Sequence, residues 1–256
     1  MSPKNTGRQP GFAWRVFPSA SVLADAAATF ITEAIQVKPA LIFGASSGGT
    51  PTLTYEKLTA PGMREKGLFD KFRVFQVDEW GGLPSDDPAT CAVYLRKYLL
   101  QPAGIPPDRF LGFHSDAPDP EQECGRMESW LAANGPIDLC LLGLGLNGHL
   151  ALNEPSESLH PFCHVAKLSV QSSHHPMLEA AAKPPRYGLT IGLGDIMRSR
   201  KVMLLVSGSH KNAMMKRLLD PLVRNDFPAS YLWLHPNAVC MCDQAAVEGL
   251  HLPQSL

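Results

Sequence analysis

Short apolar runs alternate along the chain with longer segments in which apolar residues recur at helical spacing. The runs predict strands over 40–43, 72–77, 137–142, 187–193, 202–206, 230–234 and 238–242. The other segments predict helices over 21–36, 52–58, 88–100, 121–133, 177–182 and 212–219, the second of them with Thr50 as its N-cap. Strands that alternate with helices are typical of the α/β class, in which helices cover both faces of a mainly parallel, open sheet.

The chain shows no sign of a second domain. No linker rich in Gly, Ser and Pro interrupts the alternation, and no segment repeats along the 256 residues. α/β folds of this length are commonly single units. We therefore expect one Rossmann-like, three-layer domain over residues 1–256, in which residues 1–18 form an extended N-terminal segment.

The charge balance limits the kinds of partner. The chain has 23 Lys and Arg residues against 24 Asp and Glu residues, and no block of like charges, which gives no support to a nucleic-acid-binding arm or a membrane-binding patch. The apolar runs are far shorter than the roughly 20 residues that span a bilayer, and the polar start lacks the apolar segment of a signal peptide. We expect a cytoplasmic protein that binds a small molecule, and the sequence leaves a homo-oligomer open.

Cysteine and histidine spacing gives no support to a metal site or a disulfide framework. The six cysteines are scattered and form no Cys-x-x-Cys pair. The adjacent His174 and His175 cannot act as an i, i+4 pair of metal ligands. We therefore predict free thiols, no bound metal and no cofactor.

The stretch from Gly143 to Pro155 carries candidate catalytic groups. It follows the predicted strand 137–142, and open α/β sheets bind ligands beyond the carboxyl ends of their strands. His149 and Glu154 lie five residues apart, so the carboxylate could hydrogen-bond the imidazole, fix its tautomer and raise its basicity. A tight turn with a structural histidine would use the same glycines, and this loop alone leaves both interpretations open.

A second loop of small residues is suited to bind an anion. Between the predicted strand 40–43 and the helix 52–58 lie Ser46, Ser47, Gly48, Gly49 and Thr50. Their backbone N–H groups can approach an anion closely, and the dipole of the following helix favours negative charge at its first turn. The loop lacks the Lys of a P-loop and the spacing of a dinucleotide fingerprint, which favours a phosphate over a nucleotide. A simple tight turn is the alternative.

Two further strand ends carry charged groups. Asp78 and Glu79 follow the predicted strand 72–77, where partial burial can raise a carboxyl pKa into the range of a general base. Adjacent residues in an extended chain point opposite ways, so only one of the two can face a given ligand. Lys211 follows the strand 202–206 and can reach a phosphate as a point charge. A turn-capping Asp and a surface Lys are the ordinary alternatives, but four such loops at one sheet edge predict a phosphosugar site.

The motifs occur in an order that resembles the glucosamine-6-phosphate deaminases. The resemblance covers roughly residues 20–245 and is carried by Gly44 to Pro51, Asp78-Glu79-Trp80, Asn147-Gly148-His149 through Glu154-Pro155, and Gly208 to Lys211. The runs Asn153 to Leu159 and Ser230 to His235 look most like the galactosamine-6-phosphate branch. The wider superfamily also holds the 6-phosphogluconolactonases.

The resemblance implies a metal-independent enzyme that isomerises an aminohexose 6-phosphate to a ketohexose 6-phosphate with loss of ammonia. It implies that His149 opens the pyranose ring and that Glu154 holds and charges its imidazole. Asp78 would carry the proton from C2 to C1. The phosphate would be held by Lys211 together with Ser47, Gly48, Gly49 and Thr50.

Two positions depart from the pattern of that family. Many members have Asp where this chain has Asn147, and a neutral amide can orient His149 but adds no charge and accepts no proton. Where bacterial glucosamine-6-phosphate deaminases supply a phosphate-binding Arg, this chain has none. We expect His175 to take that part, weakly and with pH dependence.

Two other functions stay open at this point. Hydrolysis of 6-phosphogluconolactone needs no base at C2, but lactonases usually have a Thr-Ala-Ser type sequence where this chain has Leu150 to Asn153. A non-catalytic sugar-phosphate sensor would need neither Asp78 nor an imidazole with its orienting carboxylate. The sequence favours the deaminase, with galactosamine or glucosamine 6-phosphate as substrate and tagatose or fructose 6-phosphate as product.

Overall fold

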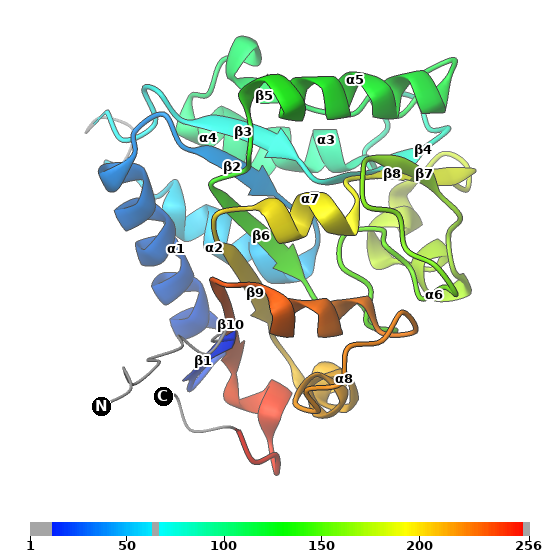
Figure 1. Ribbon diagram of the computed structural model, residues 1–256. Coiled ribbons are helices and arrows are strands. Elements are labelled where there is room, and N and C mark those ends of the chain that lie inside the picture. The colour runs from blue at the N-terminus through cyan, green and yellow to red at the C-terminus, as the bar shows by residue number, and fades with distance from the viewer. Residues whose placement is uncertain (1–11, 63–66, 253–256) are drawn as a thin grey trace, which may run out of the picture.

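A seven-stranded sheet forms the centre of the computed structural model, which describes residues 12–62 and 67–252 (Figure 1). Its strands lie in the order β1-β10-β9-β6-β2-β3-β5, and all neighbours pair in parallel. Their bounds are Phe12–Phe17 for β1, Ile42–Ala45 for β2, Arg73–Gln76 for β3, Phe110–Leu111 for β5, Leu139–Gly143 for β6, Val202–Val206 for β9 and Ala238–Asp243 for β10. The mainly parallel α/β sheet predicted from the sequence is confirmed.

A smaller antiparallel sheet continues from the large one. Its order is β4-β8-β7, with bounds Asp78–Gly81, Tyr187–Thr190 and His164–Ala166. β4 follows β3 after the single residue Val77, whose carbonyl oxygen accepts the Ile191 N–H at 2.9 Å. The register places Asp78 opposite Thr190, so the second sheet holds this carboxyl at the end of β3.

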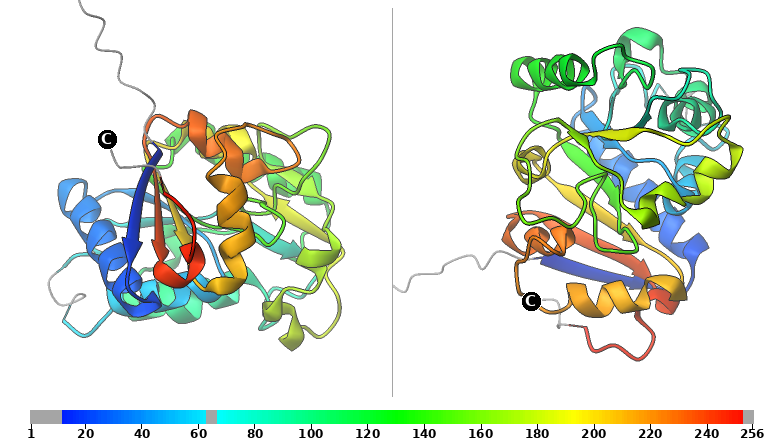
Figure 2. Two further views of the ribbon diagram at one scale, coloured as in Figure 1. Left: turned by 90° about the horizontal axis from the view of Figure 1, so that it is seen from below. Right: turned by 90° about the vertical axis from the view of Figure 1, so that its right-hand side faces the viewer.

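Helices cover both faces of the large sheet, as the two views of Figure 2 show. They are α1 (Ala20–Val37), α2 (Gly49–Leu58), α3 (Cys91–Leu95), α4 (Gln101–Ala103), α5 (Pro120–Asn134), α6 (Val170–Ser173), α7 (Leu193–Arg198) and α8 (Asn212–Leu218). A π-helical segment over Arg96–Leu100 joins α3 to α4, and 3-10 turns lie at Pro107–Arg109, Pro176–Ala180, Ser209–Lys211, Pro228–Leu234 and Gln244–Val247.

Successive side chains of a buried strand point to opposite faces of the sheet, so each strand packs against both helix layers. Leu139 and Leu141 of β6 point into one apolar cluster with α1, α2 and α3, whereas Cys140 and Leu142 point into another with α5, α7 and α8. All four side chains are at most 1% exposed. Both faces of β6 are therefore covered, which explains why its sequence is continuously apolar.

α1 is the one helix among the described residues that is long and apolar enough to cross a membrane by length and composition. Its apolar stripe is formed by Leu23, Ala27, Ile31 and Ile35. Each is at most 2% exposed and lies in the apolar cluster that also contains Leu139 and Leu141 of β6. This stripe at helical spacing is what a helix packed on a sheet requires. We therefore assign α1 to the core.

The helix after β2 begins earlier than the sequence predicted. Thr50 is not its N-cap, because α2 starts at Gly49 and Gly48 is the N-cap residue. Gly48 has φ +118°, a backbone conformation that favours glycine. This freedom lets the chain enter the helix before the threonine is reached.

The predicted strand over 230–234 is wrong, because this segment lies in the 3-10 turn Pro228–Leu234. Ala229 and Leu232 are both fully buried, and their spacing of three residues matches the period of a 3-10 turn rather than that of a strand. The Trp233 ring packs 5.4 Å from that of Phe12. Apolar composition alone did not distinguish the two structures.

Other differences concern boundaries and short elements. The strand predicted over 187–193 ends at Thr190, since α7 begins at Leu193, and the helix predicted over 177–182 is a 3-10 turn. The helix predicted over 88–100 starts at Cys91. Within the expected extended segment 1–18, residues 12–17 form the edge strand β1, and residues 1–11 lie outside the described residues.

Candidate active site

The four predicted loops lie at one edge of the large sheet. β9, β6, β2 and β3 are neighbours in that order, and all run parallel. The segments that follow their carboxyl ends carry Lys211, His149, the small residues 46–50 and Asp78 respectively. Such an edge is where open α/β sheets bind their ligands.

Asn147 bridges His149 and Glu154. Nδ1 of His149 lies 3.5 Å from Oε2 of Glu154, an ion-pair contact longer than a good hydrogen bond. The Asn147 side-chain amide donates to the same Oε2 at 2.7 Å, while its carbonyl oxygen accepts the His149 backbone N–H at 3.2 Å. The contact between imidazole and carboxylate that the sequence suggested is therefore present at 3.5 Å, and the Asn147 amide links the carboxylate to the backbone of His149.

Glu154 has hydrogen-bond partners on both of its carboxylate oxygens. Oε1 accepts from the hydroxyl of Ser169 at 3.1 Å and from that of Ser172. Burial alone would raise the pKa of Glu154, but contact with His149 and hydrogen bonds from Ser172 and Asn147 outweigh it and lower the pKa to about 2. Glu154 is thus a fixed negative charge beside the imidazole.

Two glycines of the loop are required by close packing. A Cβ atom at Gly145 would lie 2.4 Å from the His149 ring, and one at Gly148 would lie 2.1 Å from the Phe227 ring. Gly148 also has φ +90°. The loop is therefore a tight turn whose glycines let the backbone pack directly against the His149 and Phe227 rings.

Asp78 and Glu79 face different surroundings, as expected for adjacent residues of a strand. Oδ1 of Asp78 is buried and has no hydrogen-bond partner among the described residues. Burial, with a smaller contribution from the Glu79 charge, raises the pKa of Asp78 to about 7. Glu79 is fully buried and accepts four hydrogen bonds of 2.7–2.9 Å. Asp78 is thus the carboxyl left available to a ligand.

The loop over 46–50 leads into the N-terminus of α2. The Ser46 hydroxyl is buried without a hydrogen-bond partner among the described residues, whereas the Ser47 hydroxyl donates to Sγ of Cys91 at 3.0 Å. Gly49 and Thr50 form the first turn of the ten-residue α2, and its N-cap Gly48 supplies no side-chain hydrogen bond. The first turn therefore presents its backbone N–H groups without a capping side chain, as an anion site requires.

Lys211 and His175 are the remaining residues predicted to bind the phosphate. Nζ of Lys211 donates to the Leu144 carbonyl oxygen at 2.6 Å, and burial lowers the pKa of this ammonium group. A Cβ atom at Gly48 would lie 4.0 Å from Nε2 of His175, so this ring reaches the N-terminus of α2. Burial, and then the charges of His149 and Lys211, lower the pKa of His175 to about 4. Without a bound anion His175 is therefore neutral near pH 7.

Ser169 and Ser172 were missed by the sequence reasoning. They lie 15 and 18 residues beyond Glu154, outside the loop that carries it. Ser169 is the N-cap of α6, and a serine before a short helix was the one available signal. That signal indicates a helix start, but it does not reveal contact with a carboxylate.

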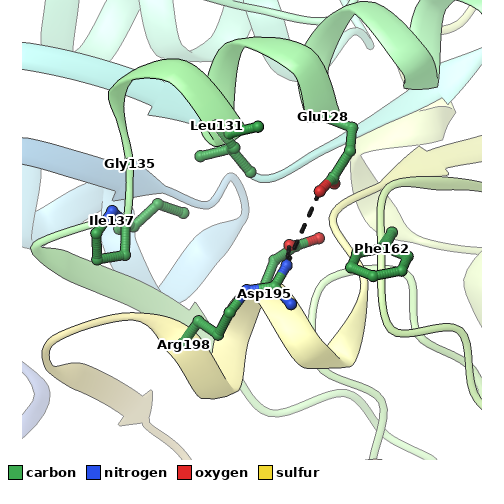
Figure 3. A pocket seen from close by; sticks show the side chains of 9 residues that line it. Glu128, Leu131, Gly135, Ile137, Phe162, Asp195 and Arg198 are labelled. Carbon is green, nitrogen blue, oxygen red and sulfur yellow. Dashed lines mark hydrogen bonds and ion pairs between the residues drawn. The ribbon is translucent and has the colours of Figure 1, made fainter.

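A separate cavity of about 590 Å³ lies between α5 and α7 (Figure 3). It is lined in part by Ile137, which precedes β6, whereas His149 follows that strand. The Arg198 guanidinium lies 2.5 Å from Asp195 and 3.8 Å from Glu128. This cavity is therefore at the other end of β6 from the four loops.

Three side chains of the kind that bind metals gather beside this cavity. Ligand atoms of Glu128, Cys163 and Asp195 all lie within 4.8 Å of one another. The group joins three separate elements, so a search for short ligand spacing could not find it. Arg198 already pairs with both carboxylates, and we assign the cluster no function.

Comparison with known proteins places the chain in a family. The family described as glucosamine-6-phosphate isomerases/6-phosphogluconolactonase matches residues 18–241. A protein of Escherichia coli (strain K12) with the provisional name deaminase AgaI is 38% identical over 86% of this chain and 88% of its own length. Glucosamine-6-phosphate deaminase 1 of Bacillus subtilis (strain 168) is 33% identical over 88% of this chain and 93% of its own length.

Solved structures give the same result. A monomeric glucosamine-6-phosphate deaminase is 32% identical, with a TM-score of 0.85 over 91% of this chain and 98% of its own. The 6-phosphogluconolactonase of Trypanosoma brucei is 22% identical, with a TM-score of 0.76 over 94% of this chain and 99% of its own, a likeness of fold alone. The chain belongs to the family of glucosamine-6-phosphate isomerases and 6-phosphogluconolactonases.

Proposed function

We propose that this chain converts an aminohexose 6-phosphate and water to a ketohexose 6-phosphate and ammonia. The observation that carries the proposal is the carboxyl of Asp78, at the same sheet edge as the His149–Glu154 pair: its Oδ1 is buried without a hydrogen-bond partner among the described residues, and its pKa is raised to about 7. A general base is most effective when its pKa lies near the working pH. The deaminase names of the relatives at 38% and 33% identity agree with this assignment.

The substrate phosphate binds at the N-terminus of α2 in this proposal. The N–H groups of Gly49 and Thr50, the Lys211 ammonium and the His175 ring surround the anion. A phosphate dianion there favours protonation of His175, whose pKa in the empty site is lowered to about 4. Binding energy from this remote group then positions the sugar carbons at the catalytic groups.

His149 opens the pyranose ring. It takes the proton from the O1 hydroxyl and delivers a proton to O5, so the C1–O5 bond breaks and C1 becomes an aldehyde. Glu154 places a negative charge beside the imidazole, and Asn147 links that carboxylate to the backbone N–H of His149. The imidazole is neutral again when ring opening is complete.

Asp78 then moves a proton between two carbons. Its carboxylate takes the proton from C2 as O1 gains a proton from solvent, which leaves an enolamine. The resulting carboxylic acid returns the proton to C1 as the nitrogen gives up a proton to solvent. The product is an imine at C2, and water hydrolyses it to the ketone with release of ammonia. Proton removal at C2 and proton return at C1 need one group that alternates between its ionised and protonated forms. A pKa of about 7 suits Asp78 to this role.

An ammonia-release assay on the purified protein tests the proposal. The two substrates are galactosamine 6-phosphate and glucosamine 6-phosphate, compared by kcat/KM because they differ only at C4. 6-Phosphogluconolactone is assayed in parallel. Lactone hydrolysis without ammonia release would identify a lactonase, and tight phosphosugar binding without turnover would identify a sensor, so either result overturns the proposal.

We also propose a cytoplasmic location. All six cysteines lie within the described residues and are free, as is usual where thiols are kept reduced. The expected small-molecule partner is the phosphosugar. The sequence leaves a homo-oligomer open. Size-exclusion chromatography with light scattering tests this by measuring the molar mass of the protein.

A further inference from the structure

Ser172 is a buried serine that contacts Glu154 from outside its loop. Its side chain is in the core at 2% exposure, on the short helix α6. Its hydroxyl donates to Oε1 of Glu154 and lies 3.5 Å from Nδ1 of His149. A buried hydroxyl placed between a carboxylate and an imidazole can affect the orientation of both.

The contacts on Glu154 divide between its two oxygens. Oε2 faces Asn147 and His149, and Oε1 faces Ser169 and Ser172. Turning the plane of the carboxylate away from this arrangement would leave donors unpartnered on both sides, which is costly for buried groups. The two serines therefore help fix the orientation of the carboxylate relative to the imidazole.

The backbone around Ser172 holds the hydroxyl in place. Its N–H donates to the Ser169 hydroxyl at 3.1 Å, which caps the helix. Its carbonyl oxygen accepts the His175 N–H at 3.1 Å. The segment from 169 to 175 thus joins a contact with Glu154 to the ring that reaches the N-terminus of α2.

We propose that Ser172 is a positioning residue for ring opening, which holds the carboxylate of Glu154 in the orientation that faces His149. The proposal rests on the proposed deaminase function. Ser172 acts through its hydrogen bond to Glu154. Its loss should therefore slow turnover and leave the binding of a ligand that needs no ring opening unchanged.

Ser172→Ala is the main variant, and an open-chain 2-amino-2-deoxyhexitol 6-phosphate is the binding probe. We expect kcat to fall roughly 10- to 100-fold, the size of effect seen when a residue that orients a metal-binding side chain is removed. The dissociation constant of the open-chain probe, measured by calorimetry, should stay within about twofold of the wild-type value. Ser172→Thr, which keeps a hydroxyl, should restore most of the turnover.

Ser173→Ala is the matched control. Ser173 is the next residue of α6, and its hydroxyl donates to the Ser169 carbonyl oxygen at 2.9 Å at the surface. Its replacement tests the helix without touching Glu154, and kcat should stay near the wild-type value. If Ser172→Ala does not fold in a thermal melt, Ser172→Cys supplies the same test, because its thiol fills the space but is a weak donor.

Two results overturn the inference alone. One is a Ser172→Ala enzyme with wild-type kcat, and the other is an equal loss of turnover and of open-chain probe binding, which indicates a general structural role. A wild-type protein that releases no ammonia from either substrate overturns the proposed function, and this inference with it. The wild-type assay therefore separates the two failures.

Discussion

The side-chain amide of Asn147 donates a 2.7 Å hydrogen bond to Oε2 of Glu154. Its carbonyl oxygen accepts the backbone N–H of His149, so the orientation of the amide is fixed from both sides. A neutral donor at this position stabilises an ionised Glu154, whose pKa is lowered to about 2. An aspartate at position 147 would instead place a second carboxylate, which is also an acceptor, against the carboxylate of Glu154.

Asn147→Asp should change the pH dependence of turnover. Two carboxylates at this distance cannot both ionise at low cost, so the pair would hold one proton until the pH is raised. We expect the ratio of variant to wild-type kcat/KM to fall roughly tenfold between pH 6 and pH 8. The measurement is a pH profile of both enzymes with one substrate. A ratio that stays constant across this range would show that the amide is not needed as a donor.

Asp78→Asn should abolish ammonia release without preventing binding. The amide has nearly the same shape but cannot accept the C2 proton, and loss of a general base typically costs about 10²- to 10⁴-fold in rate. The open-chain aminohexitol phosphate should bind with a dissociation constant near the wild-type value. Near-full turnover would exclude Asp78 as the base.

The same substitution should stabilise the protein at high pH. The pKa of Asp78 is raised from 3.8 to about 7 on folding, so the native state binds the proton more tightly than the unfolded chain does. This contribution to stability is fully present below pH 3.8 and is lost as the pH rises through about 7. Asp78→Asn should therefore have a higher Tm than the wild type at pH 8 and a similar Tm at pH 4. A lower Tm at pH 8 would argue against the burial of this charge.

Glu79→Gln should act on both stability and pH dependence. Three backbone N–H groups and the Gln76 side-chain amide donate to this buried carboxylate, so a glutamine would turn its own NH₂ group toward a donor. A loss of about 1–3 kcal/mol in the free energy of unfolding is expected. Loss of the charge also lowers the pKa of Asp78, and the acid limb of kcat/KM should move to lower pH. Urea denaturation and a pH profile measure the two effects, and an unmoved acid limb would contradict the second.

Lys211→Ala should weaken substrate binding more than it slows turnover. The ammonium group of Lys211 is half-buried. A hydrogen bond from such a group to the charged substrate phosphate contributes about 1.5–3 kcal/mol, which is equivalent to roughly 10- to 100-fold in KM. Steady-state kinetics with the phosphorylated substrate check this. Lys216→Ala is the matched control, because Lys216 is exposed on α8 and should leave KM unchanged. Equal effects of the two substitutions would remove Lys211 from the phosphate site.

Local pattern located the elements that are long or buried on both faces, although β2 lies at Ile42–Ala45 rather than 40–43 and β6 at Leu139–Gly143 rather than 137–142. The strand 202–206 has the predicted bounds, and α1 and α5 differ from their predictions by one residue at each end. Pattern failed at 230–234, where a 3-10 turn and a strand bury the same kind of side chain. It also missed β7, which has three residues and is defined by its partner β8.

The sequence by itself determined the fold class and the residue types at the strand ends. The spacing of hydrophobic residues and the loops of small residues are local properties of the chain, so they can be recognised without the tertiary structure. Only the tertiary structure decided that β9, β6, β2 and β3 are neighbours, since strand order depends on long-range pairing. It alone placed the Asn147 amide between His149 and Glu154 and brought Ser172 against that carboxylate. It also left Oδ1 of Asp78 buried without a hydrogen-bond partner in the part of the chain that the structure describes. Burial and contact set the pKa of a carboxyl group, and neither can be read from the order of residues along the chain.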